Sequence, residues 1–147
     1  MGVFAMKFIV CGGRDFGDNV DRIRFPEEYE LKERQKGFIR FTLEYIWNVK
    51  QGEIEIATGC ARGADAVTRE WCEHNEVPFN VYYANWDKYG KAAGFLRNSQ
   101  MYDHFQPDAV LAFPGGRGTE MMCKIAKEGG TQVKKFEFNE NSLFTNL

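Results

Sequence analysis

Short apolar runs alternate with longer segments of helical periodicity along the chain, and this alternation most constrains its fold. Predicted strands lie at residues 7–11, 53–57, 79–84, 108–113 and 131–138; the first is a short apolar run, and the second alternates apolar and polar residues. Helical segments lie at 37–49, from 63–65 until Pro78, at 95–105 and at 120–127. Strands alternating with helices form βαβ units with right-handed crossovers. The sequence therefore predicts an α/β fold, a Rossmann-like three-layer sandwich with a mainly parallel sheet.

The 147 residues suit one domain, which we place at residues 1–138, followed by a loose C-terminal tail at 139–147. Two stretches show no clean period and are predicted as loops, at 15–36 and 86–94. The first is longer than about 15 residues, a length that is uncommon in a compact domain and often functional.

Composition narrows the function classes. No run approaches the ~18 apolar residues of a membrane span, and the start lacks the basic region of a secretory signal. The formal charge of −2 makes nucleic-acid binding unlikely. The four cysteines form no C-x-x-C pair and only two histidines occur, so we expect free thiols, no metal site and no cofactor. Free thiols favour a reducing, cytoplasmic location.

Three glycine-bearing turns follow predicted strands, at residues 12–15, 59–65 and 114–119. The carboxyl ends of parallel strands meet at one edge of the sheet, where ligands of such folds bind. Helix N-termini near each turn attract anions, and glycine lets a phosphate approach the backbone closely. Arg14, Arg62 and Arg117 add one guanidinium per turn. The turns therefore predict a phosphate-bearing ligand, although neither a Walker A motif nor G-x-G-x-x-G is present.

Four motifs in order carry a family resemblance: GGRDF at 12–16, GCARGAD at 59–65, NWDKYGKAAGFLRNSQM at 85–101 and PGGRGTEMM at 114–122. Together they resemble the SLOG superfamily, in the branch related to YspA and YpsA, from about residue 7 to residue 133. The resemblance implies a Rossmann-like fold whose glycine turns cradle a nucleotide. Superfamily members include nucleotide sensors of antiviral defence and, more distantly similar to this chain, the Lonely Guy enzymes, which hydrolyse the N-glycosidic bond of nucleoside monophosphates.

The chain departs from the Lonely Guy pattern at one position. That pattern places a glutamate three residues after the threonine of its PGG-x-GT element, where this chain has Met122. Its R-x-x-x-M element is matched by Arg97 and Met101. Glu120 is nearby, but it lies ~200° around the helix from Met122 and cannot simply replace the missing carboxylate. Half of that family's catalytic pair is thus present.

The site expectations follow from the turns and the resemblance. Arg97, Glu120, Asp15 and Asp65 are the candidate catalytic residues. The expected ligand-binding residues are Gly12, Gly13, Arg14, Asp15, Gly59, Arg62, Gly63, Asp65, Trp86, Lys91, Gly94, Arg97, Asn98, Pro114, Gly115, Gly116, Arg117, Gly118 and Thr119.

Several of these residues have purely structural alternatives. Asp65 can cap a helix rather than bind ribose, and Trp86 can pack in the protein rather than stack on a base. Lys91 can be solvated, and Glu120 can pair with Lys124 one helical turn away.

The favoured function is a module that senses or sequesters a nucleotide, or a nucleotide-derived ligand, through its phosphates. The alternatives are hydrolysis of an N-glycosidic or related bond and, more weakly, single-stranded DNA binding. Self-association is also expected, because segment 37–49 carries more apolar surface than one sheet contact needs. The alternative is that residues 15–36 cover that surface within one chain.

Overall fold

A computed structural model describes residues 5–140. Five parallel strands form one sheet in the order β3-β2-β1-β4-β5. They are β1 (Met6–Cys11), β2 (Ile54–Gly59), β3 (Phe79–Tyr82), β4 (Ala109–Ala112) and β5 (Gln132–Lys135). The helices are α1 (Pro26–Val49), α2 (Ala64–His74), α3 (Trp86–Tyr89), α4 (Ala93–Phe105) and α5 (Arg117–Glu128), with a 3₁₀ turn η1 (Gly90–Ala92) before α4. The α/β, Rossmann-like prediction is confirmed.

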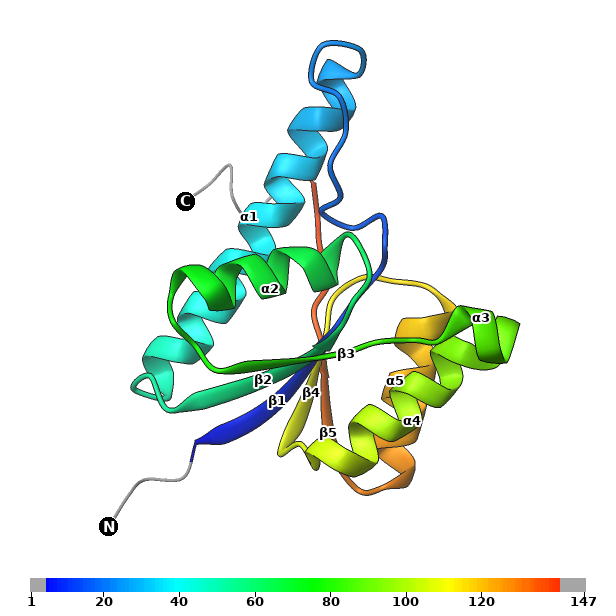
Figure 1. The fold of residues 1–147 in the computed structure, drawn as a ribbon. Coiled ribbons are helices and arrows are strands. Elements are labelled where there is room, and N and C mark those ends of the chain that lie inside the picture. Colours follow the sequence, from blue (N-terminus) through cyan, green and yellow to red (C-terminus); the bar gives the residue numbers. More distant parts are fainter. Residues whose placement is uncertain (1–4, 141–147) are drawn as a thin grey trace.

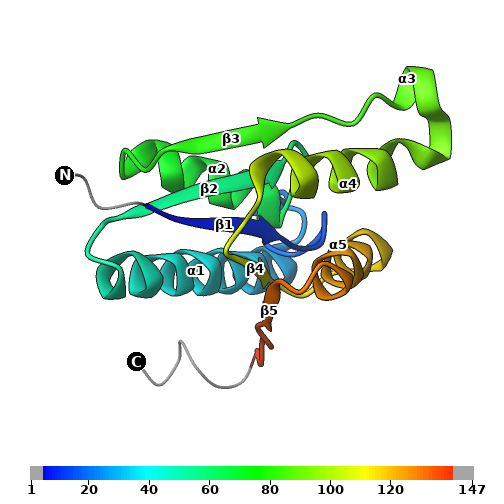
Figure 2. The same cartoon turned by 90° about the horizontal axis from the view of Figure 1, so that it is seen from below.

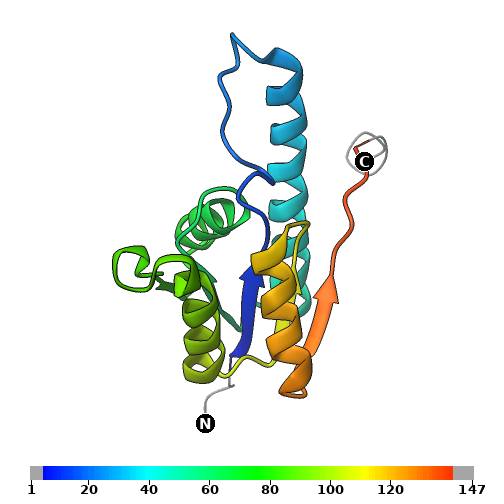
Figure 3. The ribbon, with the colours of Figure 1, turned by 90° about the vertical axis from the view of Figure 1, so that its right-hand side faces the viewer.

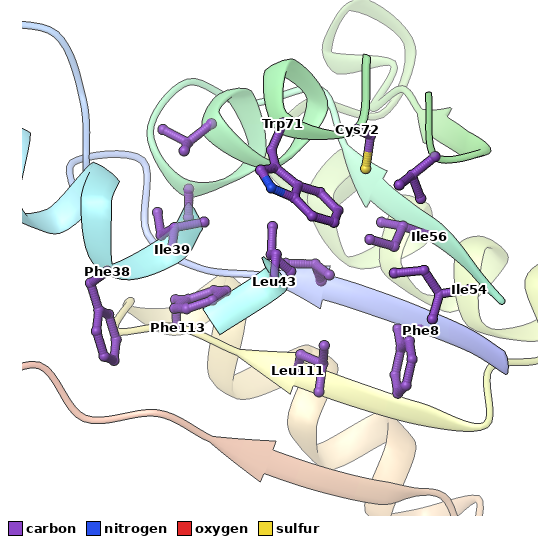
Figure 4. Close-up of a cluster of buried hydrophobic side chains, with 14 of the residues drawn as sticks. Phe8, Phe38, Ile39, Leu43, Ile54, Ile56, Trp71, Cys72, Leu111 and Phe113 are labelled. Atoms are coloured by element: carbon purple, nitrogen blue, oxygen red, sulfur yellow. The ribbon is translucent and has the colours of Figure 1, made fainter. Parts of the chain in front are cut away.

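Alternate residues of the strands face two helical layers. Phe8 and Val10 of β1 lie in the cluster formed with α1 and α2, which Figure 4 shows, whereas Ile9 between them packs against Met101 of α4 and Met122 of α5. Helices α1 and α2 thus cover one face of the sheet and α4 and α5 the other (Figure 1 and Figure 2). This burial on both faces explains the apolar runs of the central strands β1 and β4, whereas the edge strand β5 is largely exposed.

The predicted loop at 15–36 is wrong over its second half. Helix α1 begins at Pro26, because proline suits the first helical position and Glu27 and Glu28 stabilise the first turn. The helix then runs through Gly37 without a break. Figure 3 shows that its first half extends beyond the strands. That half packs against little of the sheet, so it lacks the apolar period by which a helix is recognised.

Other predicted boundaries move by a few residues. The predicted loop at 86–94 is wrong, because α3, η1 and the start of α4 together occupy it. The side chain of Asn85 accepts a hydrogen bond from the backbone N–H of Lys88 and caps α3. Helix α5 starts at Arg117, inside the predicted glycine turn. Strand β5 ends at Lys135, but Phe136 and Phe138 still pack on the core. The expected tail lies outside the described residues from position 141 onward.

The apolar surface expected on segment 37–49 is only partly exposed. Phe38 and Leu43 are buried in the same chain, and the Trp47 ring contacts Trp71 of α2 edge-on. Phe41 and Tyr45 remain exposed, at 46% and 64%. In the described part of the chain, no helix has the length and apolar character needed to cross a bilayer.

A candidate ligand pocket at the carboxyl edge of the sheet

The three predicted turns meet at the carboxyl ends of β1, β2 and β4. The backbone N–H of Gly13 donates to the carbonyl of Pro114 at 2.9 Å. Gly63, with φ of +74°, passes so close to the first turn that a β-carbon there would lie 2.2 Å from the carbonyl oxygen of Arg14. Glycine is therefore required where the turns touch one another. The first two turns open onto a shared surface beside α3 and α4.

A pocket of about 290 Å³ lies on that surface, and it brings together four predicted ligand residues from separate parts of the chain. Its lining is Arg14, Cys60, Ala61, Arg62, Trp86 and Arg97. Cys60 and Ala61 lie inside the predicted GCARGAD turn but were not singled out, since their side chains carry no phosphate-binding chemistry. Three guanidinium groups thus face one cavity. A second cavity of about 270 Å³ lies at the far end of α4 and has Asp103 as its only charged lining residue.

Arg97 is held in place by groups of its surroundings. Its Nε donates to the side-chain oxygen of Asn98 at 2.9 Å, and its Nη1 donates to the carbonyl of Tyr82 at 3.3 Å. The guanidinium lies over Gly59, where a β-carbon would be 2.5 Å from Nη1. Gly59 therefore makes room for Arg97, a packing role that differs from the predicted contact with ligand. The part-buried cation is oriented toward the pocket before any ligand arrives.

Asp65 lies behind the pocket and is absent from its lining. Its Oδ1 is 3.0 Å from the Thr58 hydroxyl, and its Oδ2 accepts from the backbone N–H of Ala61 at 3.3 Å. Burial raises the pKa of the Asp65 carboxyl, although the Thr58 hydroxyl and the positive charge of Arg97 oppose the shift. Asp65 thereby fixes the β2–α2 turn that carries Cys60 and Ala61.

Arg14 and Trp86 form one wall of the pocket. The Arg14 guanidinium lies over the Trp86 ring, 5.5 Å from its centroid. The ring also lies over Gly94, where a β-carbon would be 3.4 Å from the indole. Trp86 still exposes 46% of its surface. The absence of a side chain at Gly94 thus leaves room for the indole. Lys91, another predicted ligand residue, is exposed and does not line the pocket.

Arg62 is bound by two carboxylates. Its Nη2 donates to Asp15 Oδ1 at 3.1 Å, and its Nε donates to Asp18 Oδ2 at 2.9 Å. Hydrogen bonding to Asp15 and the charge of Asp18 raise the pKa of Arg62. Asp15 therefore contacts an arginine in this structure. Asp18 was missed, because the sequence pattern did not distinguish it from the other polar residues of segment 15–36.

The third turn lies beside the pocket and does not line it. Arg117 is exposed at the start of α5, and Thr119 is buried with its hydroxyl directed at Gly115. The side chain of Asn98 donates to the carbonyl of Gly118 at 3.2 Å, which ties this turn to α4. A phosphate at residues 115–119 remains a prediction.

Met122 and Glu120, the two α5 residues compared with the Lonely Guy pattern, lie in different environments. Met122 is fully buried and packs with Met101 in the second core cluster. Glu120 forms an ion pair with Lys135 of β5 at 2.9 Å. The expected pairing of Glu120 with Lys124 is therefore wrong, because β5 supplies a cation that the sequence spacing does not reveal. Among the described residues, no three His, Cys, Asp or Glu side chains are grouped to hold a metal ion.

The five-stranded parallel sheet, with a basic pocket at its carboxyl edge, defines a doubly wound α/β domain. The chain belongs to the YspA, cpYpsA-related SLOG family, whose sequence model matches residues 6–89. The matched range includes Arg14, Arg62 and Trp86, and it ends before Arg97.

The chain is similar to the gene 61 protein of Mycobacterium phage D29, with 36% identity over 105 residues that cover 62% of this chain and 83% of the phage protein. No solved structure matches.

Proposed function

We propose that this protein binds a nucleotide, or a nucleotide-derived ligand, through its phosphate at the pocket formed by Arg14, Arg62, Trp86 and Arg97. The observation that carries the proposal is the convergence of three guanidinium groups, from three separate segments, on one cavity. Guanidinium donors match phosphate oxygens in geometry and charge.

Arg97 and Trp86 have distinct roles in this proposal. Arg97, held by Asn98 and Tyr82, supplies a fixed cation for the phosphate. Trp86 offers an exposed ring on which a base can stack. The cavity volume of about 290 Å³ lies near the lower end of small-molecule sites, and it suits one nucleotide unit.

The environment of the candidate carboxylates favours binding without hydrolysis. Glu120 is paired with Lys135, Asp15 is paired with Arg62, and Met122 leaves no acid where the Lonely Guy pattern has one. We therefore propose that the protein acts as a sensor or a sequestering module.

Thermal unfolding in the presence of nucleotides tests the proposal. The ligands are nucleoside monophosphates, cyclic nucleotides, ADP-ribose and a short single-stranded DNA, each at millimolar concentration. A ligand at one hundred times its Kd stabilises the fold by ~2.7 kcal/mol. Arg14→Gln should reduce the shift, whereas Lys124→Gln, the same charge change on exposed α5, should not. The absence of any shift in the wild type contradicts the proposal, and a shift with DNA alone favours the nucleic-acid alternative.

A second candidate function rests on Asp65. Burial raises the pKa of this carboxyl, as a general acid requires, although the charge of Arg97 opposes the shift and Asp65 does not line the pocket. Chromatography for free base released from nucleoside monophosphates tests this candidate. Turnover that disappears in Asp65→Asn would replace the binding module with a glycosidic-bond hydrolase.

A further inference from the structure

The edge of Arg62 suited to a phosphate is already occupied. A guanidinium binds a phosphate with two parallel N–H donors, such as Nε and one terminal nitrogen. In this structure those two donors are taken by oxygens from two different carboxylates, Asp18 at 2.9 Å and Asp15 at 3.1 Å. An anion that uses this edge must displace both, or it must bind Arg62 from the remaining side.

The backbone of the segment that carries the two carboxylates is attached to α1. The Lys32 ammonium donates to the carbonyl of Asp15 at 2.5 Å, and the backbone N–H of Gly17 donates to the buried side chain of Gln35 at 2.8 Å. Lys32 and Gln35 both belong to α1, so these two hydrogen bonds attach the short segment that bears the acids to this long helix. The side chain of Asp18 is only 22% exposed. Asp18 is thus a largely buried partner of Arg62, whereas Asp15 pairs with Arg62 from a side chain that is 84% exposed.

The charges of the site are nearly balanced as a result. Arg62 is matched by two acids, whereas Arg14 and Arg97 form no ion pair with a described residue. The three arginines of the pocket lining and the two acids paired with Arg62 together sum to one net positive charge. A further negative charge on a ligand that contacts Arg62 would lie near the two acids paired with this arginine and would be repelled by them.

Phosphate groups differ in this charge. A phosphate esterified on one side carries about −1.5 to −2 near pH 7, since its second pKa is about 6. A phosphodiester has lost that second acidic proton to an ester bond and carries a single charge. The single net positive charge of these three arginines and two acids matches the single negative charge of the diester.

We propose that Asp15 and Asp18 are specificity-determining residues that make the pocket prefer nucleotides whose phosphate is a diester over nucleotides with a terminal phosphate. This inference rests on the proposed function and narrows its ligand class. Cyclic nucleotides and nucleotides joined through a phosphodiester bond belong to that class. Arg14 and Arg97 bind the single charge, while the two acids repel a second one.

Matched ligand pairs test the inference by isothermal titration calorimetry at low salt. Each pair shares its base and sugar and differs in phosphate charge: adenosine monophosphate with cyclic adenosine monophosphate, and the same for guanosine, cytidine and uridine. The wild type should bind the cyclic member of the preferred pair more tightly. In the double variant Asp15→Asn/Asp18→Asn, affinity for the monophosphate should rise by about two- to fivefold per acid removed, the range for partly exposed charge pairs.

A matched control separates local from overall charge. Asp103→Asn removes one negative charge at the far end of α4 and should leave the preference unchanged. Asp15 is 84% exposed, so Asp15→Asn alone gives the same readout if the double variant does not fold. A wild type that prefers the monophosphate, or an unaltered preference in the Asn variants, overturns the inference while the proposed function stands. Wild-type protein that binds none of the nucleotides contradicts the proposed function itself.

Discussion

The guanidinium of Arg97 lies against the backbone of Gly59, at a place where a β-carbon on residue 59 would be 2.5 Å from Nη1 and 2.7 Å from Asp65 Oδ2. The φ of Gly59 is not positive, so glycine is needed here because a side chain would not fit, and not because of the backbone conformation. Gly59 of β2 thus allows the Arg97 guanidinium and the buried Asp65 carboxyl to lie close to the same stretch of backbone.

Gly59→Ala should consequently displace Arg97 and weaken both the fold and the site. Overpacking of this kind typically costs about 1–3 kcal/mol of unfolding free energy. Chemical denaturation measures the loss, and calorimetry with the best nucleotide measures the accompanying fall in affinity. Gly118→Ala is the control, because a β-carbon there meets nothing within 4 Å and a helical alanine is favourable. Equal stability of the Gly59 and Gly118 variants would contradict the steric role of Gly59.

Arg97→Ala should reduce nucleotide affinity about ten- to a hundredfold. The physical reason is the loss of a charged hydrogen-bond donor from a part-buried site, which typically costs about 1.5–3 kcal/mol. Arg97→Lys keeps the charge but loses the fork that binds Asn98 and Tyr82, so it should recover only part of the affinity. Titration calorimetry gives the comparison. Wild-type affinity in Arg97→Ala would remove this residue from the site.

The sequence predicted β1 and β4 most directly, because these central strands are buried on both faces and are therefore apolar runs. It did not reveal the first half of α1, since residues 26–36 project from the body and bury no regular stripe. The strand ends predicted that Arg14 and Arg62 lie together, but Arg117, predicted by the same argument, does not line the pocket. Arg97 was expected at the site from the family resemblance. The pairing of Asp18 with Arg62, and of Glu120 with Lys135, joins residues far apart in the chain and follows only from the packed structure.

The buried Asp65 predicts a specific dependence of stability on pH. Its pKa is raised in the folded state above the ordinary value of 3.8, mainly by burial, so the folded protein binds its proton more tightly than the unfolded chain. The contribution of Asp65 is thus most favourable at low pH and declines as the pH rises above about 3.8 toward the folded pKa. Urea denaturation of the wild type and Asp65→Asn at several pH values measures this contribution. Wild-type stability should fall relative to the variant with rising pH, and parallel curves would contradict the shifted pKa.

Self-association through α1 is a further prediction. Tyr45 and Val49 lie one turn apart and expose 64% and 55% of their surfaces, so they present adjacent apolar groups to solvent. We expect light scattering at high micromolar concentration to give a mass above that of one chain. Tyr45→Glu should lower that mass, because association would then bury a charge. A monomeric wild type at this concentration would exclude the prediction.

Cys60 provides a chemical report on occupancy of the pocket. Its part-exposed thiol lines the cavity, so a bound ligand should shield it from alkylation. If only the empty protein reacts, a ligand at ten times its Kd should slow modification by iodoacetamide about tenfold. Peptide mass spectrometry follows Cys60 separately from the buried Cys72. Arg14→Gln, with weakened binding, should lose the protection at the same ligand concentration. An unchanged rate at Cys60, under conditions where calorimetry shows saturation, would place the ligand elsewhere on the protein.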